Sequence, residues 1–406
     1  MQRSDYQKVR EFNQLVHQED DPALLDRVVF GNPFNRPEDF YMLEDGEQIL
    51  AFGGLLPRHH RLGTETVPVG EIGVIGTHPE YRRQGLGRQL MAHLLKTARE
   101  RGYALCFLYG IRDYYQRFGF AYAVPHHAYD YLQIDKGLLQ RWQCHHQVES
   151  FSEADLPGMA ELYAENCQHI PCSQVRSQDY WQHKTSTTNV GPHQWYVFRQ
   201  ERQLRGYLWV TEDASAGRVL IREAAVADDA AVESIGAYLY AKIALVEQAQ
   251  RVSARVPLGH PFGDYLFRHG ARAACYNQIF PGTWAGMYRI VDLTVVCEAL
   301  RGSFQERISR SRFWRLSQTY KLQTELGSVV LHLDDGKVQI LVDKLSDQTL
   351  PVAADILTQM VTGYQDALYH QQRLQHLSPD QMELLQVLFP LGNPYIWDLE
   401  ESEELR

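Results

Sequence analysis

One stretch, from Glu71 to Arg88, constrains the fold more than any other part of the chain, because it places a strand, a glycine-bearing turn and a helix in succession. The strand runs to Thr77, and the turn after it carries the pattern Arg82-x-x-Gly85-x-Gly87. Apolar side chains then recur on one helical face, at Leu86, Leu90, Met91, Leu94, Leu95 and Ala98. The pattern predicts a helix from Leu86 to about Arg101, stopped at Gly102.

The start of this helix has the features of an anion-binding site. A helix N-terminus leaves about four amide N–H groups unpaired, and the helix dipole places partial positive charge there. Gly85 and Gly87 let the backbone approach an anion closely, while Arg82, Arg83 and Arg88 add fixed charge. Strand, arginines, glycines and helix occur in the order that a pyrophosphate-binding loop needs. The alternative interpretation is a loop that only turns the chain.

The order of elements predicts an α+β protein with more than one domain. The chain has 406 residues, enough for two to four domains at roughly 100 to 200 residues each. Helical spacing in the first 40 residues gives way to antiparallel strands, the helix described above and an apolar strand over 104–109. A second unit repeats this shape without its glycines. We expect domains at 1–140, 141–286 and 287–406.

Composition and charge exclude several classes of function. Forty basic residues against 50 acidic ones give a net charge of −10, which disfavours a nucleic-acid binder and suits cationic small molecules. Five of the nine residues over 398–406 are acidic. No apolar run approaches the roughly 18 residues of a membrane span, and the first residues resemble neither a signal nor a transit peptide. We therefore expect a cytoplasmic protein that does not bind membranes.

Metal-binding patterns are weak in this sequence. The pairs His59-His60 and His126-His127 and the run from Cys144 to His146 lack the helical spacing and third ligand of a metal site. The six cysteines form no CxxC pair, and we expect them to be reduced. We expect no metal ion.

Two motifs together resemble a known family. The pattern at Arg82, Gly85 and Gly87 resembles motif A of the GNAT acyl-CoA N-acetyltransferases, Arg/Gln-x-x-Gly-x-Gly/Ala after the fourth strand. The segment from Tyr109 to Phe120 ends in Tyr-Gln-Arg-Phe-Gly-Phe and is similar to the family's Tyr-x-Arg-Phe-Gly-Phe/Tyr segment. The whole-chain layout is similar to the Eis (enhanced intracellular survival) group.

The resemblance implies a fold for each part of the chain. The Eis group has a GNAT domain, a degenerate second GNAT domain and a C-terminal α+β domain like sterol carrier proteins. A GNAT domain is a mixed, mostly antiparallel, splayed sheet with flanking helices. The segment from Tyr288 to Leu293 resembles the opening of the third domain. The group also suggests a homo-oligomer.

The resemblance further implies acetyl-CoA as co-substrate and assigns binding residues. In the family, the pantetheine arm pairs with the free edge of the strand before motif A, which implies backbone contacts at Ile75, Gly76 and Thr77. An amide there would polarise the thioester carbonyl. The pyrophosphate would lie on the loop that comprises Arg82, Arg83, Gln84, Gly85, Leu86, Gly87 and Arg88.

Two residues are candidates for proton transfer. Tyr115 falls where the group places its general acid, and a phenol with a pKa of about 10 is protonated at neutral pH. Glu71 lies 14 residues before Gly85, a spacing at which some GNAT enzymes place a catalytic glutamate. The Eis group uses its C-terminal carboxylate as the base instead. In this chain the segment from Phe389 to Tyr395 resembles the end of the Eis chains, but an acidic tail follows it as far as Arg406. We therefore do not assign the role of base to the terminal carboxylate. The structural alternatives are a core aromatic for Tyr115 and a neighbour-pairing carboxylate for Glu71.

The sequence thus predicts an acetyl-CoA-dependent N-acetyltransferase in which an amine attacks the thioester directly. The negative charge of the chain suggests an acceptor that is cationic before it reacts, but no motif names it. The alternative of another class is a non-catalytic protein that senses CoA or binds an apolar ligand in its C-terminal domain. Tyr115 beside an intact motif A favours the enzyme.

Overall fold

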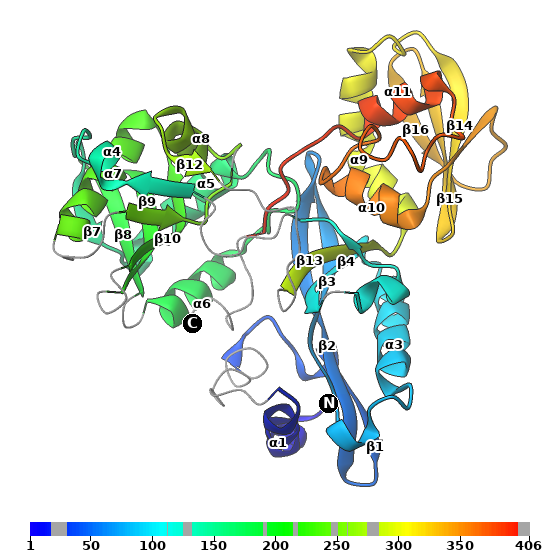
Figure 1. Cartoon of the computed structure of the whole chain (residues 1–406), viewed down its shortest axis with the longest axis horizontal. Coiled ribbons are helices and arrows are strands. Elements are labelled where there is room, and N and C mark those ends of the chain that lie inside the picture. The colour runs from blue at the N-terminus through cyan, green and yellow to red at the C-terminus, as the bar shows by residue number, and fades with distance from the viewer. Residues whose placement is uncertain are drawn as a thin grey trace. The chain divides into compact units, whose positions relative to one another are not determined.

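The chain divides into two units that are interleaved in sequence. Unit 1 comprises Met1–Val124 and Ile279–Arg406, and unit 2 comprises Pro125–Gln278. The computed structural model (Figure 1) describes residues 1–17, 31–111, 113–124, 132–189, 193–213, 218–244, 251–257, 259–273 and 284–396. Part of the helical spacing expected in the first 40 residues, the histidine pair at 126–127 and the acidic tail lie outside these residues.

A six-stranded mixed sheet forms the N-terminal part of unit 1, in the order β1-β2-β3-β4-β13-β5. Its elements are α1 (Tyr6–His17), β1 (Phe40–Asp45), β2 (Gln48–Leu62), β3 (Glu65–Thr77), α3 (Leu86–Glu100), β4 (Leu105–Ile111), β5 (Ala121–Tyr122) and β13 (Trp284–Ile290). The hairpins joining β1, β2 and β3 turn at Gly46 and Gly63, both with φ of 62°, where glycine is favoured because it has no Cβ. The predicted helix after motif A is confirmed as α3.

Strand β13 joins this sheet from a distant part of the sequence. It pairs antiparallel with β4 from Trp284 opposite Ile111 to Ile290 opposite Leu105 (Figure 1). In the strand order it separates β4 from β5. Conversely, β6 (Leu132–Asp135), which lies within the expected first domain, pairs in the sheet of unit 2. Sheet membership therefore crosses the expected boundaries at both points, and the three-domain division stays a prediction.

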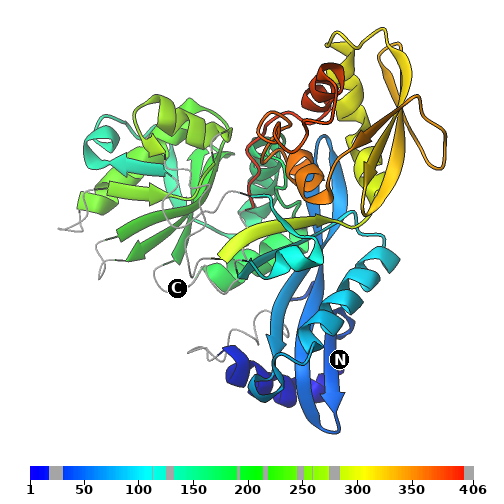
Figure 2. The same cartoon turned by 45° about the vertical axis from the view of Figure 1, so that its right-hand side comes forward.

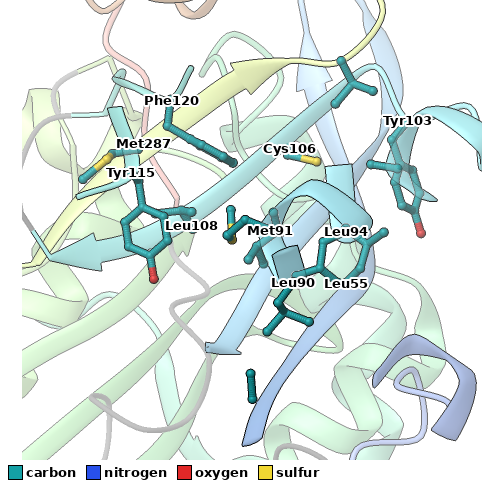
Figure 3. Close-up of a cluster of buried hydrophobic side chains, with 14 residues drawn as sticks. Leu55, Leu90, Met91, Leu94, Tyr103, Cys106, Leu108, Tyr115, Phe120 and Met287 are labelled. Atoms are coloured by element: carbon teal, nitrogen blue, oxygen red, sulfur yellow. The ribbon is translucent and has the colours of Figure 1, made fainter. Parts of the chain in front are cut away.

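Helices α1 and α3 pack on opposite faces of the first sheet (Figures 1 and 2). The apolar stripe of α3 is buried, with Leu90, Met91, Leu94 and Ala98 at most 1% exposed. Figure 3 shows these side chains among residues of β2, β4 and β13. Burial of one such leucine contributes roughly 1.5–3 kcal/mol, so this face fixes α3 against the sheet.

The C-terminal part of unit 1 is a second α+β layer packed on the first sheet. Its elements are α9 (Leu293–Ser309), β14 (Ser317–Thr324), β15 (Gly327–Asp334), β16 (Lys337–Leu341), β17 (Gln348–Pro351), α10 (Ala354–Thr362) and α11 (Pro379–Leu388). The strand order is β16-β15-β14-β17. Gln359 of α10 donates a 2.8 Å hydrogen bond to the Tyr122 carbonyl, which ties this layer to β5. Strands β15 and β16 are separate because Asp335 and Gly336 have positive φ and turn the chain between them.

Unit 2 is a seven-stranded sheet with helices, in the order β12-β6-β11-β10-β9-β8-β7. Besides β6 it contains α4 (Lys136–Leu139), β7 (Gln147–Ser150), α5 (Leu156–Asn166), α6 (Gln178–Thr188), β8 (His193–Gln200), β9 (Gln203–Asp213), β10 (Arg218–Val226), α7 (Asp229–Ala244), β11 (Arg251–Ala254), α8 (Pro261–Arg268) and β12 (Arg272–Ala273). Strands β10 and β11 pair in parallel, as β3 and β4 do in unit 1. The predicted repetition of the first unit's shape is thus visible at its centre. Among the described residues, no helix is long and apolar enough to cross a membrane.

Candidate active site

The candidate site begins where β3 and β4 separate. These strands pair in parallel over only three positions, from Val69 opposite Leu105 to Glu71 opposite Phe107. Beyond that point β3 stays paired with β2 as far as Thr77, and β4 continues against β13. Within the described chain, no strand covers the β4-facing edge of β3 after Glu71. Such an edge offers backbone groups to a ligand that carries amides, because main-chain N–H and C=O groups need partners.

The exposed end of β3 is irregular. Val74 has φ of 47°, which is rare for a β-branched residue, and the β2–β3 register shifts between Phe52 and Gly54. Bulges of this kind occur next to active sites, where they redirect backbone groups. Ile75, one residue later, is half-buried and packs on the α3 side. The irregularity therefore falls where the sequence predicts a backbone donor to the thioester.

Gly76 and Thr77 occupy opposite faces of β3. A Cβ on Gly76 would lie 2.9 Å from Cγ1 of Val16 and 3.1 Å from Phe12, so α1 packs directly against this glycine. Thr77 instead faces the start of α3, with Oγ1 3.5 Å from the position of a Cβ on Gly87. Two of the predicted contact residues thus have identifiable packing roles that keep β3 in place.

The loop before α3 is open at the position that the glycine pattern predicts. Gly85 is the N-cap of α3, in the left-handed region with φ of 84°, and an added Cβ would have nothing within 4 Å. No side chain in the described chain caps this helix, and its first amides are left for another partner. The side chains of Arg82, Arg83, Gln84 and Arg88 are exposed around it. Free amides, an open approach and three guanidinium groups fit a pyrophosphate.

Tyr115 begins the short 3-10 helix η5 (Tyr115–Phe118) and lies over β4. A Cβ on Gly110 would come within 2.3 Å of its ring, so the glycine makes room for the phenol. Tyr115 is 8% exposed, and burial, with a smaller contribution from Tyr114, raises the pKa of its hydroxyl above the ordinary value. The hydroxyl points away from Phe120 and Met287 (Figure 3). It therefore keeps its proton at neutral pH, and its role as a general acid stays a prediction.

The structure adds Tyr114, which the sequence analysis did not select as a site residue. Its Oη lies 2.9 Å from where a Cβ on Gly87 would be, at the first turn of α3. The guanidinium of Arg117 lies 4.7 Å from the centre of its ring. The signal in the sequence was the doubled tyrosine before Arg-Phe-Gly, but adjacency along the chain did not reveal which hydroxyl reaches α3.

Glu71 lies at the fork of the two strands, and its carboxylate is already paired. Its Oε2 is 2.9 Å from Nε of Arg58, and both side chains are buried. Arg58 in turn donates to the Asn35 side chain at 3.2 Å and to the Pro57 carbonyl at 2.9 Å. This ion pair is the structural alternative for Glu71, and its role as a base stays a prediction.

The corresponding place in unit 2 is filled by the protein itself. Strands β10 and β11 also separate after three pairs, at Ile221 and Ala254. The Asn166 side chain then forms two 2.9 Å hydrogen bonds with the backbone of Val226. At the start of α7, Asp228 accepts a 2.9 Å bond from the Ala231 amide and pairs with Arg205. Both the strand edge and the helix start therefore have internal partners.

Three of the histidines considered as metal ligands have other contacts. His60 Nδ1 is 2.7 Å from the Tyr288 hydroxyl, His145 is 3.0 Å from Glu233, and His146 is 2.8 Å from Ser234. Over the described ranges, no three histidine, cysteine or acidic side chains gather as a metal-binding group. Cys106, Cys144, Cys167, Cys172 and Cys297 are free thiols.

Comparison with known proteins assigns the first part of the chain. Residues 1–123 match the model of the acetyltransferase (GNAT) domain family. A GCN5-related N-acetyltransferase from Anabaena variabilis has a similar structure, with a TM-score of 0.75 and 16% identity over 98% of both chains. One from Kribbella flavida also has a TM-score of 0.75 and 16% identity, over 98% of this chain and 96% of its own. No curated protein sequence matches the chain.

Eis1 from Mycobacterium abscessus is a further structural relative, with a TM-score of 0.67 and 16% identity over 98% of both chains. At this identity the solved structures show a shared fold, and that fold extends over nearly the whole chain. The protein therefore carries an acetyltransferase domain of the GNAT class, a class that uses acetyl-CoA. The likeness of its C-terminal part to sterol carrier proteins stays a prediction.

Proposed function

We propose that unit 1 transfers the acetyl group of acetyl-CoA to an amine by direct attack of the amine on the thioester. The observation that carries the proposal is the fork of β3 and β4 after Glu71, next to the uncapped start of α3. A strand edge that can pair with amides and a helix start that can bind a pyrophosphate thus belong to adjoining segments. Acetyl-CoA, when bound, supplies the activated acyl group.

Each residue of the site has a role in this proposal. The first amides of α3, with Arg82, Arg83 and Arg88, hold the pyrophosphate, and the free edge of β3 at Ile75 to Thr77 pairs with the pantetheine arm. A backbone N–H of this edge stabilises the oxygen that becomes negative during attack. The buried Tyr115 hydroxyl donates its proton to the departing thiolate. Glu71 accepts the proton of the amine, and Arg58 fixes the orientation of its carboxylate.

The test is release of free thiol from acetyl-CoA across a panel of amines that includes polyamines, aminoglycosides and lysine peptides. We expect release that depends on both the protein and an amine and that is lost in Gly85→Glu, where a carboxylate occupies the pyrophosphate loop. Gly102→Glu is the matched control, because Gly102 also has positive φ and open space around a Cβ, at the other end of α3. Binding of acetyl-CoA without thiol release for any amine would favour the CoA-sensing alternative.

A further inference from the structure

Unit 2 holds a guanidinium group inside an aromatic cage. Arg176 lies in the loop between α5 and α6, and its side chain is 0% exposed. The central carbon of its guanidinium is 4.0 Å from the centre of the Tyr163 ring and 4.5 Å from that of the Trp181 ring. Its two Nη atoms donate hydrogen bonds of 2.8 and 2.7 Å to the two carboxylate oxygens of Glu223, on β10. The proposed function does not use this group.

The carboxylate of Glu223 has the surroundings of a group that binds cations. It is buried, and the Tyr207 hydroxyl of β9 donates a 2.7 Å hydrogen bond to its Oε1. Burial, with the nearby carboxylate, raises the pKa of Tyr207 well above its ordinary value, so the phenol remains a donor. A bidentate carboxylate flanked by aromatic rings is an arrangement that recognises a planar guanidinium ion. The cage therefore has the chemistry of a cation-binding site, and Arg176 is its occupant.

The segment that carries Arg176 also occupies the free edge of β10. Asn166, at the end of α5, accepts a 2.9 Å hydrogen bond from the Val226 amide and donates one of 2.9 Å to the Val226 carbonyl. Val226 lies five residues after Ile221, the last residue of β10 that pairs with β11. Gly76 lies five residues after Glu71, the last residue of β3 that pairs with β4. A side-chain amide in unit 2 thus pairs at the strand position where the proposed function places a ligand in unit 1.

We call residues 166–176, which connect these two contacts, the plug. The Tyr163 hydroxyl donates a 2.9 Å hydrogen bond to the Gln174 carbonyl and holds the plug against α5. Cys172, within the plug, has φ of 66°, in the left-handed region that costs energy for a residue with a side chain. The contacts at the two ends of the plug therefore maintain its shape against the local backbone preference.

We propose that unit 2 contains a binding site for an alkylguanidinium ion, and that the chain's own Arg176 is the ligand that closes it. A buried ion pair is seldom required for stability alone, since apolar residues of similar volume are often as stabilising. The bidentate pair and the two rings around it are features of cation recognition. The site stands independently of the proposed function, and only the parallel with unit 1 rests on that function.

The experiment removes the internal ligand and supplies a free one. The full chain with Arg176→Ala is titrated calorimetrically with methylguanidine, whose cation matches the missing group. We expect one site per chain with a dissociation constant on the order of 1 mM, and no binding to the wild type, whose cage is full. Methylurea, which has a similar shape and no charge, should not bind. The matched control adds Glu223→Gln to Arg176→Ala and should weaken binding of methylguanidine by about 10-fold or more.

A second measurement addresses stability, because removing one partner of a buried ion pair is strongly destabilising. Methylguanidine at about ten times its dissociation constant should raise the melting temperature of Arg176→Ala and leave that of the wild type unchanged. A variant that does not fold alone should be recovered by refolding in methylguanidine and not in methylurea.

Three results would overturn the inference. The first is methylguanidine that neither binds nor stabilises Arg176→Ala, and the second is an equal effect of methylurea; either would make the Arg176–Glu223 pair purely structural. The third is binding of methylguanidine that is as tight in the wild type or in the Glu223→Gln control, which would place the ligand elsewhere. None of these measurements involves acetyl-CoA, so their failure is distinct from failure of the proposed function.

Discussion

Glu71 and Phe107 form the last backbone pair between β3 and β4. Everything proposed for the site depends on this pair, because the strand edge that lies beyond it has no neighbour in the described chain. The same pair places the Glu71 carboxylate at the fork, beside Arg58.

Removing the Tyr115 hydroxyl tests the general acid. In Tyr115→Phe the ring still fills the space over Gly110, so we expect kcat to fall by about 10²- to 10⁴-fold with little change in acetyl-CoA affinity. Steady-state kinetics and calorimetry measure the two effects. Tyr114→Phe is the matched control, with kcat near wild type. A larger loss of kcat in Tyr114→Phe than in Tyr115→Phe would transfer the role to Tyr114.

Replacing Glu71 distinguishes a base from a structural ion pair. As a base, Glu71→Gln should lower kcat by about 10²-fold or more. Arg58→Met breaks the same buried pair, a change that typically costs about 3–5 kcal/mol, yet keeps the carboxylate and should therefore retain more of kcat than Glu71→Gln. The measurements are steady-state kinetics and chemical denaturation of both variants. If both variants lose only stability, Glu71 has a structural role.

Each chain should bind one acetyl-CoA. In unit 2 the strand edge is bound by Asn166 and the start of α7 by Asp228, so neither is available to the ligand. Calorimetry should give one site per chain, and that site should disappear in Gly85→Glu and persist in Gly102→Glu. Two sites of similar affinity, or binding that survives Gly85→Glu, would contradict this prediction.

His260 should make stability depend on pH. It is the N-cap of α8 and fully buried, and burial lowers its pKa from 6.5 to about 3. Below pH 6.5 the unfolded chain binds a proton that the folded chain does not, so stability should fall by about 1.4 kcal/mol per pH unit down to about pH 3. Above pH 6.5 this loss is absent.

The control for His260 is His260→Asn, which keeps a capping acceptor and removes the titrating ring. Urea denaturation of both proteins between pH 7.5 and 4.5 should show a steeper loss in the wild type. Equal slopes for the two proteins would mean that folding does not lower the pKa of His260.

Deletion of the acidic tail tests whether its negative charge attracts a cationic acceptor. Deleting Glu400 to Arg406 removes four of the five acidic residues over 398–406, so kcat/KM for a multiply charged amine should fall and lose part of its salt dependence. Acetyl-CoA binding should not change. Unchanged kcat/KM at low salt would exclude steering by the tail. Better turnover of neutral or anionic acceptors would contradict a cationic substrate.

Much of the site could be predicted from sequence because its signals are local. The order of strand, glycines and helix between Glu71 and Gly102 depends on neighbouring residues only, since glycine conformations and helical periodicity act over a few positions. The same holds for Tyr115 in its short motif. Local chemistry thus identified α3, the open loop at Gly85 and the tyrosine, together with the α+β class.

The tertiary structure decided what depends on distant partners. No local pattern indicates that β13 completes the first sheet. The partner of a strand depends on which sheet edge the rest of the fold leaves open, and the residues of the strand do not specify that edge. The pairing of Glu71 with Arg58, the contact of Tyr114 with Gly87 and the position of Arg289 beside Gly119 likewise join segments that the sequence separates. Sequence alone indicated the candidate residues, and packing determined which of them meet.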